Sequence, residues 1–278
     1  MSDLARPIAI LFAGAGIAFL FFMGGVQWYG NWYQRWSTML PPISDGLCSI
    51  AVIPIQGEIV PYDGFYDETE YSAVATSGDF VERYLKEAEA DPNIFGVVVE
   101  IDSGGGYGAA SMQIMNAIKN VSIPVVAYVR EVGASGAYLA ATAADSIIAS
   151  PFATVGSIGV TYSYVDNVQK NKNEGLNFVE LASGPYKDTG NPNKPLSEAE
   201  RRLFERDLEI FADVFIEAVA RNRALAEGEV RAMADGSAMP ASLALEQKLI
   251  DAVGSEDEVR AWFAASLERD LESIILCK

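Results

Sequence analysis

The chain has 278 residues, half of them hydrophobic, and a formal net charge of −18 at neutral pH. This length and composition suffice for one well-filled core and argue against a disordered chain. The acidic charge repels phosphate backbones, so nucleic acid is not expected as a partner. The chain contains no histidine, which excludes every catalytic arrangement that needs an imidazole, including Ser-His-Asp and Cys-His.

An uncharged and mostly apolar segment occupies residues 7–26. As a helix, these twenty residues would reach about 30 Å, the thickness of a bilayer's hydrocarbon core. A cleavable signal peptide is the alternative, but its apolar region is usually about 7–15 residues long and ends in a small-x-small site. Here an aromatic cluster typical of the lipid–water boundary follows instead, with Trp28, Trp32 and Trp36. We expect an uncleaved membrane-spanning helix, within an anchor, aromatic belt and linker that occupy residues 1–46.

Strand and helix patterns alternate from about Cys48 onward. Residues 95–101 form a continuous apolar run, which is typical of a strand buried on both faces of a parallel sheet. The pattern predicts strands at 49–55, 95–101, 124–129, 146–149, 158–164 and 177–181, and helices at 80–90, 107–119 and from Ser135 to about 144. Residues 57–77 are expected to be irregular. The sequence therefore predicts an α/β core over residues 47–196, with a parallel sheet and right-handed βαβ crossovers.

A capping box formed by Ser197 and Glu200 predicts the start of a long helix that ends near residue 223. Shorter helices are expected near 227–234, 241–247 and 256–269. We expect this helical region, residues 197–278, to complete the core and to form oligomer contacts.

The two cysteines, Cys48 and Cys277, can pair only if the two ends of the domain meet. Without histidine or a CxxC motif, metal sites with nitrogen or sulfur ligands are excluded by the number of ligands. No loop has the spacing of a calcium site. We therefore expect neither a cofactor nor a metal ion.

A glycine-rich run lies between the strand at 95–101 and the helix that follows it. Gly104, Gly106 and Ala109 satisfy the G-x-G-x-x-A form of a dinucleotide-binding loop. However, about fifty residues of folded chain precede the run, and the next acidic candidate, Glu131, is farther away than the usual distance of about twenty residues. A second interpretation is that the glycines present backbone N–H groups to a developing oxyanion, with Gly105 and Gly136 as donors. A tight turn selected for packing alone is the third interpretation.

Ser135 lies among glycine and alanine residues where a strand is expected to turn into a helix. Without histidine, the base for a serine nucleophile must be an amine or a carboxylate, and Ser-Lys is a known variant. Lys187, in an expected loop, is the candidate base, and it needs a dry site because a lysine accepts a proton only as the neutral amine. Ser157 is the candidate partner that orients this amine. Taken singly, such serines are more often packing or turn residues, and a loop lysine is more often solvated.

Five motifs in this order resemble the signal peptide peptidase A family (peptidase family S49), whose members are membrane-anchored Ser-Lys proteases with the ClpP/crotonase fold. The resemblance runs from about Cys48 to Val259, and its motifs are residues 102–106, 134–138, 154–160, 183–187 and 234–236 with the following Ala244 and Asp251. The family usually has proline where Gly104 stands here. This departure leaves the choice between Gly104 and Gly105 as an oxyanion donor open.

The resemblance implies that Ser135 is the nucleophile, Lys187 the general base and Ser157 the residue that orients the lysine, with Gly105 and Gly136 as oxyanion donors. It also implies a single-pass protein of the cell membrane with an extracytoplasmic catalytic domain. A homo-oligomer is expected, in which serine and lysine come from the same subunit or from neighbouring subunits. The implied substrates are remnant signal peptides and other short or unfolded polypeptides, cleaved through an acyl-enzyme.

Three alternatives remain beside this hypothesis. The first is a catalytically silent anchored scaffold of the same fold. The second is a nucleotide-dependent enzyme that uses residues 104–109. The third is an acyl-CoA enzyme of the crotonase type, which shares the fold but lacks the anchor and the Ser135 and Lys187 motifs together.

Overall fold

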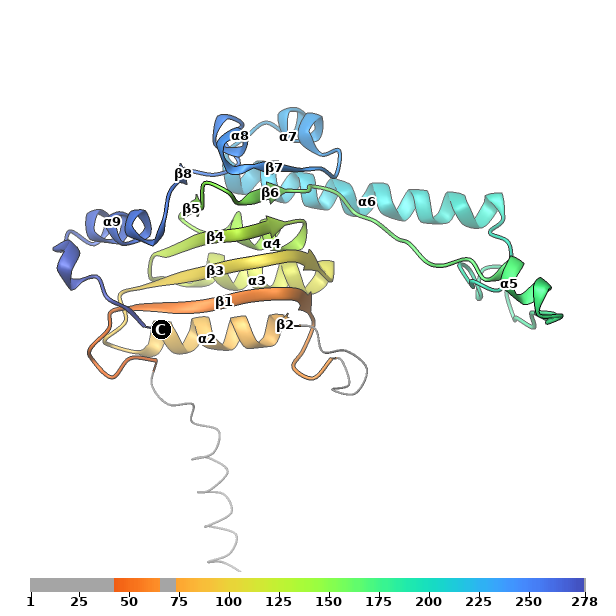
Figure 1. Ribbon diagram of the computed structural model, residues 1–278, viewed down its shortest axis with the longest axis horizontal. Helices are drawn as coiled ribbons and strands as arrows, with labels where there is room; N and C mark the ends of the chain where they lie inside the picture. Colours follow the sequence, from red (N-terminus) through yellow and green to blue (C-terminus); the bar gives the residue numbers. More distant parts are fainter. Residues whose placement is uncertain (1–42, 66–73, 278) are drawn as a thin grey trace, which may run out of the picture. The chain divides into compact units, whose positions relative to one another are not determined.

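The structure, a computed structural model, describes residues 43–65 and 74–277, and Figure 1 shows them in colour. The chain divides after Pro42, and the unit discussed below is Ile43–Lys278. The predicted membrane-spanning segment, residues 7–26, lies outside the described residues. Among the helices that the structure does describe, none is both long enough and apolar enough to cross a bilayer.

Three long neighbouring strands, β1 (Ile50–Val60), β3 (Gly96–Gly106) and β4 (Val125–Ala134), form the centre of a sheet (Figure 1). The main strand order is β2-β1-β3-β4-β5-β8, and every pair of described strands is parallel except β6 with β7. This confirms the predicted α/β class with a mostly parallel sheet. The short strands are β2 (Ala75–Ser77), β5 (Ser146–Ala149), β6 (Thr154–Gly156), β7 (Ala238–Pro240), β8 (Ala252–Val253) and β9 (Leu276–Cys277).

The predicted helices begin and end within a few residues of the expected positions, whereas the helix at Val168–Asn173 and the turn at Leu271–Ser273 were not predicted. The capping box at Ser197 is present: the serine hydroxyl accepts from the Glu200 N–H, and the Glu200 carboxylate accepts from the Ser197 N–H. The helices are α2 (Gly78–Ala90), α3 (Gly108–Asn120), α4 (Gly136–Ala141), α5 (Val168–Asn173), α6 (Glu198–Arg223), α7 (Glu227–Met233), α8 (Ala241–Glu246), α9 (Glu256–Ser266) and the 3₁₀ turn η1 (Leu271–Ser273).

Both faces of the central strands are buried, as their continuous apolar runs predict. Successive side chains of a strand point to opposite faces, so Val97 and Val99 pack on the side of α2, α3 and α4, whereas Val98 packs on the side of α9. Phe263 of α9 is fully buried on this second face. A sheet covered on both sides has little freedom to shift its register, which gives the ends of the strands fixed positions.

The predicted strands at 158–164 and 177–181 are wrong. The chain leaves the sheet after β6 and forms a segment without strands, residues 159–197, that contains α5 and lies beside the first turns of α6 (Figure 1). Val165 and Leu181 are 77% and 94% exposed, so the apolar pattern in this segment has no partner strand to pack against within the described chain. We call residues 159–197 the α5 segment.

All three central strands are longer than predicted, which changes the setting of the candidate site. β1 continues to Val60 rather than to residue 55, into a stretch that was expected to be irregular. β3 continues through the glycine run to Gly106 rather than ending at residue 101, and β4 continues to Ala134 rather than to 129. The glycines of residues 104–106 therefore stand at the end of a strand, where Gly105 departs from extended backbone with a φ of +99°. β3, β4 and β6 end at Gly106, Ala134 and Gly156 and bring these three ends to one edge of the sheet, because parallel strands have their carboxyl ends on the same side.

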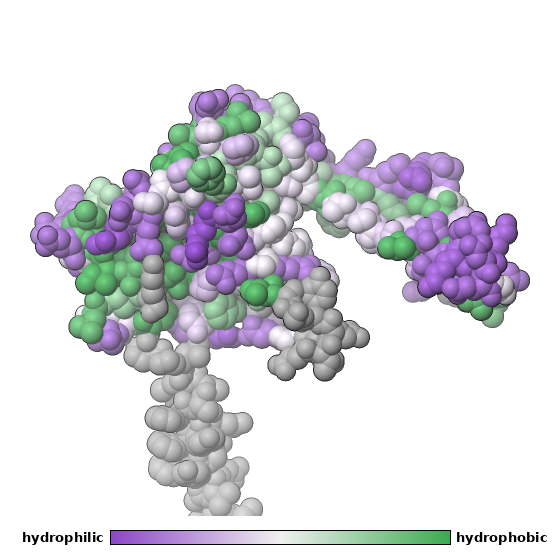
Figure 2. Space-filling view, in the orientation of Figure 1, coloured by the Kyte–Doolittle hydropathy of each residue, from purple (hydrophilic) through white to green (hydrophobic). Residues whose placement is uncertain are grey.

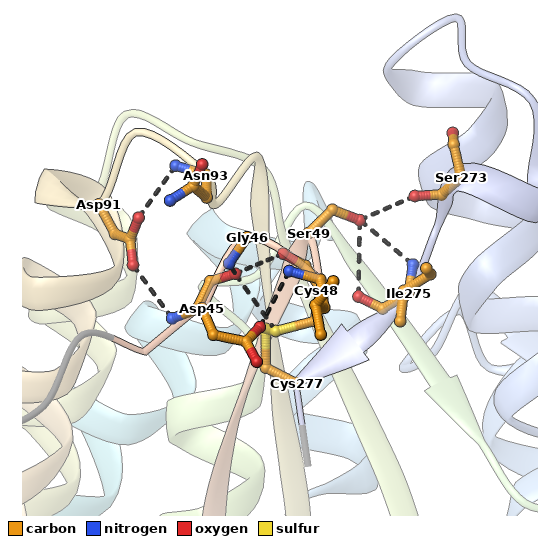
Figure 3. Close-up of a disulfide and its surroundings, with 11 residues drawn as sticks. Asp45, Gly46, Cys48, Ser49, Asp91, Asn93, Ser273, Ile275 and Cys277 are labelled. Carbon is orange, nitrogen blue, oxygen red and sulfur yellow. Dashed lines mark hydrogen bonds between the residues drawn. A yellow bond between two sulfur atoms is a disulfide. The ribbon is translucent and has the colours of Figure 1, made fainter.

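A disulfide joins Cys48 to Cys277, which are 229 positions apart in the sequence (Figure 3). The two ends of the domain meet because β9 pairs in parallel with the first residues of β1. The Ser49 N–H also donates to the Ile275 carbonyl at 2.8 Å. The bond thus fixes the start of the folded domain to its last strand.

Candidate active site

Ser135 is the residue between β4 and α4, and its backbone has an unusual conformation. Its φ is +52° and its ψ is −125°, a combination that costs a non-glycine residue of the order of 1–3 kcal/mol. Two hydrogen bonds hold this conformation: the Ser135 N–H donates to the Gly156 carbonyl at 2.7 Å, and the Ser135 carbonyl accepts from the Leu139 N–H at 3.0 Å. The side chain is thereby presented, half-buried, at the beginning of α4.

Ser135 lines a pocket of about 840 Å³ between the strand ends and α6. The wall opposite the strand ends is partly apolar, since Leu208, Ala212 and Phe215 of α6 contribute to it. No lysine or arginine is among the described residues that line this pocket. The other lining residues include Gly136, Ser157, Tyr162 and Gly236.

Ser157 lies in the same pocket because β6 runs parallel to β4. Ala134 pairs with Gly156, so the residues that follow them, Ser135 and Ser157, are neighbours at the strand ends. Ser157 also has a φ of +52°, and its N–H donates to the Ser237 carbonyl at 2.9 Å. Its hydroxyl donates to the Gly236 carbonyl at 2.9 Å, which leaves the hydroxyl oxygen able to accept a hydrogen bond from an amine.

The glycine run at the end of β3 lies directly against the Ser135 turn. A Cβ on Gly105 would come within 2.9 Å of the Ser135 Cβ and 2.7 Å of the Gly136 nitrogen. This close approach requires glycine, and the φ of +99° at Gly105 requires it as well. The Ser135 turn therefore packs directly against these glycines.

The backbone N–H of Gly105, a predicted oxyanion donor, already has a partner in this structure. It donates to the hydroxyl of Ser103 at 3.0 Å. The next nitrogen along the chain, that of Gly106, lies 3.4 Å from the position that a Cβ on Gly136 would occupy. Gly106 and Gly136 are thus the two backbone positions that face each other beside Ser135.

Lys187 is brought to neither Ser135 nor Ser157 within the chain. It lies exposed in the α5 segment and is not among the residues of the Ser135 pocket. Two contacts nevertheless hold the loop that carries Lys187. The Lys187 N–H donates to the Gly184 carbonyl, and Gly190 lies against the ring of Phe204. The Phe204 ring stacks at 4.6 Å on that of Tyr162, which lines the Ser135 pocket.

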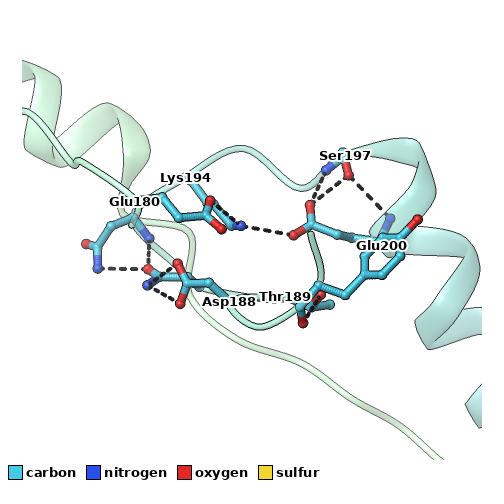
Figure 4. A network of polar contacts seen from close by, with 9 residues as sticks. Glu180, Asp188, Thr189, Lys194, Ser197 and Glu200 are labelled. Carbon is cyan, nitrogen blue, oxygen red and sulfur yellow. Dashed lines mark hydrogen bonds and ion pairs between the residues drawn. The ribbon is translucent and has the colours of Figure 1, made fainter. Parts of the chain in front are cut away.

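A second lysine of the α5 segment, Lys194, has a different environment. Its ammonium lies between two carboxylates, 2.7 Å from Glu180 Oε2 and 3.1 Å from Glu200 Oε1 (Figure 4). The hydrogen bond to Glu180, and then that to Glu200, raises the pKa of Lys194. A lysine held in this way stays charged and cannot act as a base at neutral pH. Lys194 instead fixes the α5 segment to the first turn of α6.

In residues 43–65 and 74–277, no group of three or more acidic or cysteine side chains is arranged to hold a metal. The pocket contains the hydroxyl of Ser135, the hydroxyl of Ser157 and backbone N–H groups. An enzyme that attacks a carbonyl with a serine needs a hydroxyl nucleophile and such N–H donors.

Two residues of this site were not among the sequence-based candidates. Ser103 and Gly106 both lie in the same motif as Gly105, residues 102–106, so the motif was recognised but the roles within it were not. The direction in which each N–H points depends on the local strand irregularity, which no residue pattern reveals.

The sequence of this chain is similar to a family of peptidases. The sequence model of peptidase family S49 matches residues 117–270. A protein of Methanocaldococcus jannaschii named as a protease is 32% identical over 177 residues, which are 63% of this chain and 57% of that protein. An Enterococcus faecium protein named as a signal peptide peptidase is also 32% identical over 177 residues, 62% of this chain and 52% of that protein. The chain thus spans about half the length of these curated relatives.

A solved structure has a similar fold. It is a point mutant of the 1510-N membrane-bound stomatin-specific protease in complex with a substrate peptide, with a TM-score of 0.51 and 18% identity. The similarity covers 77% of this chain and 79% of the other. At this identity the comparison concerns the fold alone.

Proposed function

Because this chain belongs to peptidase family S49, we propose that it is a serine endopeptidase that uses Ser135 as nucleophile and Lys187 as general base. The substrates we propose are remnant signal peptides and other short or unfolded polypeptides. The observation that carries the proposal is the position of Ser135: a strained serine at the start of a helix, inside a large pocket, with glycine backbone on one side and Ser157 on the other.

The proposed reaction follows from the groups in the pocket. The neutral amine of Lys187 takes the proton of the Ser135 hydroxyl as its oxygen attacks a peptide carbonyl. The N–H groups of Gly136 and Gly106 stabilise the oxyanion; Gly106 replaces the expected Gly105, whose N–H is bonded to Ser103. The lysine then gives the proton to the leaving amine. In the second half of the reaction the neutral lysine takes a proton from water as the water oxygen attacks the acyl-enzyme, and it returns a proton to the Ser135 oxygen as the acid product leaves.

We propose that Lys187 reaches Ser135 from a neighbouring subunit of a homo-oligomer. Lys187 is exposed and outside the pocket of its own chain, while apolar side chains that suit a subunit contact are exposed on the same part of the molecule. Figure 2 shows green apolar surface along α6 beside a hydrophilic tip (Figure 2). The exposed side chains include Tyr186 of the α5 segment and Ile210, Phe211 and Val214 of α6.

We also propose that residues 7–26 span the cell membrane and that the catalytic domain faces the extracytoplasmic side. The support for the membrane span is the sequence pattern alone. The support for the compartment is the Cys48–Cys277 disulfide, because disulfides persist mainly in oxidising compartments.

A serine-directed acylating probe tests the proposed function on the full chain in its native assembly. We expect labelling at Ser135, located by mass spectrometry, and loss of both labelling and peptidase activity in Ser135→Ala. Ser163→Ala is a matched control, because Ser163 is an exposed serine of the α5 segment outside the pocket. Peptidase activity that survives in Ser135→Ala would rule out the proposed nucleophile.

A catalytically silent scaffold is the second candidate, and one observation favours it. Within one chain the proposed base is not next to Ser135, since Lys187 lies outside the pocket. A scaffold predicts that the assembled wild-type protein neither reacts with the probe nor cleaves peptides, although it still oligomerises. The labelling experiment therefore separates the two candidates.

A further inference from the structure

Ser103 is a buried serine that bonds to two parts of the backbone at the edge of the proposed site. Its side chain is almost inaccessible, at 2% relative exposure. Its hydroxyl donates to the Gly57 carbonyl of β1 at 2.6 Å and accepts from the Gly105 N–H of its own strand at 3.0 Å. One side chain thus connects the neighbouring strand to the glycine run that faces Ser135.

The regular strand pairing is interrupted on both sides of Ser103. The β1–β3 register shifts between Gln56 and Glu58, where Gly57 of β1 stands opposite two residues of β3, Ser103 and Gly104, and the β3–β4 register shifts between Ile101 and Ser103. Backbone groups at such bulges lose their ladder partners, and buried groups must find others. Ser103 supplies these partners for one carbonyl and one N–H.

Ser103 is also the only residue of 103–106 with a side chain, because the other three are glycines. Glycine has more accessible backbone conformations than any other residue, so three in succession do not determine which way their peptide groups point. The hydrogen bond from the Gly105 N–H therefore fixes the orientation of the Gly104–Gly105 peptide.

This orientation is transmitted to the nucleophile by direct contact. Gly105 packs against Ser135 and Gly136 closely enough to exclude a Cβ. The φ of +99° at Gly105 interrupts the regular alternation of the strand. With the Gly105 N–H bonded to Ser103, the Gly106 nitrogen lies 3.4 Å from the position that a Cβ on Gly136 would occupy.

We infer that Ser103 is a positioning residue of the peptidase: its hydroxyl sets the orientation of the glycine backbone that stabilises the oxyanion beside Ser135. The inference rests on the proposed function. Ser103 is buried and does not line the Ser135 pocket, so we expect its removal to affect the transition state rather than substrate binding.

The test compares Ser103→Ala with Ser77→Ala in the full chain. Ser77 is a matched control: it is also buried, at 4% exposure, its hydroxyl accepts from the Phe80 N–H at 3.0 Å and donates to Asp63, and it lies outside the Ser135 pocket. For Ser103→Ala we expect kcat to fall about 10- to 100-fold, with KM within about twofold of wild type. For Ser77→Ala we expect lower stability but an unchanged kcat.

Two further measurements make the result unambiguous. Ser103→Thr keeps the hydroxyl and should recover most of the lost kcat. If Ser103→Ala does not fold, Ser103→Cys replaces it, because a thiol is a weak acceptor and the same change in kcat is expected on a smaller scale. The inference is overturned if folded Ser103→Ala or Ser103→Cys loses no more kcat than Ser77→Ala.

A readout without activity separates this inference from the proposed function. Amide hydrogen exchange of Gly105 should be slow in the wild type and faster in Ser103→Ala, with the exchange of Phe80 unchanged. If the wild type shows no Ser135-dependent cleavage, the proposed function fails while this exchange still reports on the backbone role of Ser103. Unchanged exchange of Gly105 would overturn the inference by itself.

Discussion

Ser135 and Ser157 stand side by side at the ends of two parallel strands, and both have a φ of +52°. The Ser135 N–H bonds to the carbonyl of Gly156, the residue before Ser157. Two strained serines joined in this way are held by the sheet rather than by their own conformational preferences. Changes in the backbone around them should therefore affect activity more than changes of similar size elsewhere.

Gly105→Ala should inactivate the enzyme. The added Cβ would meet the Gly136 nitrogen at 2.7 Å and the Ser135 Cβ at 2.9 Å, and a φ of +99° is unfavourable for alanine. We expect kcat/KM to fall by at least about 100-fold and stability to fall by about 1–3 kcal/mol, as measured by peptide cleavage and urea unfolding. Gly104→Ala is the control, because its Cβ would meet nothing within 4 Å. Equal effects of the two substitutions would contradict the contact between Gly105 and Ser135.

Mixing two inactive variants tests whether the catalytic pair is formed between subunits. Ser135→Ala and Lys187→Ala should each be inactive alone. Co-assembled in equal amounts, they should regain activity at roughly a quarter of the sites, where an intact serine meets an intact lysine from its neighbour. Ser135→Ala mixed with a Ser135→Ala, Lys187→Ala double variant serves as the control and should stay inactive. A pair formed within one chain predicts no recovery in the first mixture.

Reduction of the Cys48–Cys277 disulfide should destabilise the domain. The bond closes a loop that includes nearly the whole folded unit, and removal of a native disulfide typically costs about 2–5 kcal/mol. Urea unfolding with and without a reductant measures the difference. A Cys48→Ser, Cys277→Ser variant should unfold at the lower urea concentration under both conditions.

Acid should loosen the contact between the α5 segment and α6. Hydrogen bonds from the backbone and side chain of Ser197, and then from Lys194, lower the pKa of Glu200 below its ordinary value of 4.5. A carboxyl group whose pKa is lowered on folding contributes stability above its unfolded pKa, and this contribution is lost as the pH falls through the folded pKa. We expect the protection of the first turns of α6 against hydrogen exchange, corrected for the intrinsic exchange rate, to fall below about pH 4.5. Glu200→Gln removes the titrating group and should reduce this pH dependence.

The sequence predicted the central strands and most helices well because their signals are local. The apolar run at 95–101 and the capping box at Ser197 depend on neighbouring residues only. The strands predicted at 158–164 and 177–181 were wrong because a strand also needs a partner. After Ile158 the chain leaves the sheet, and apolar side chains of both predicted strands, including Val160 and Leu181, remain exposed.

The candidate site could likewise be predicted only in the features that depend on residue identity and local pattern. The absence of histidine, the small residues around Ser135 and the order of the motifs could be read directly, and they led to Ser135, Ser157 and Gly136. Which glycine N–H bonds to Ser103 could not be read, because it depends on two strand irregularities that meet at Ser103. The pairing of Cys48 with Cys277 likewise depends on where β9 joins the sheet.

The sequence by itself therefore determined the family, the α/β class and the chemical type of the candidate nucleophile, because these follow from residue identities and short-range patterns. Only the tertiary structure decided that Gly105 lies against Ser135, that its N–H is bonded to Ser103, and that Lys187 lies outside the pocket of its own chain. The physical reason is that hydrogen-bond partners and contacts between strand ends are fixed by how distant segments pack, and no local pattern encodes them.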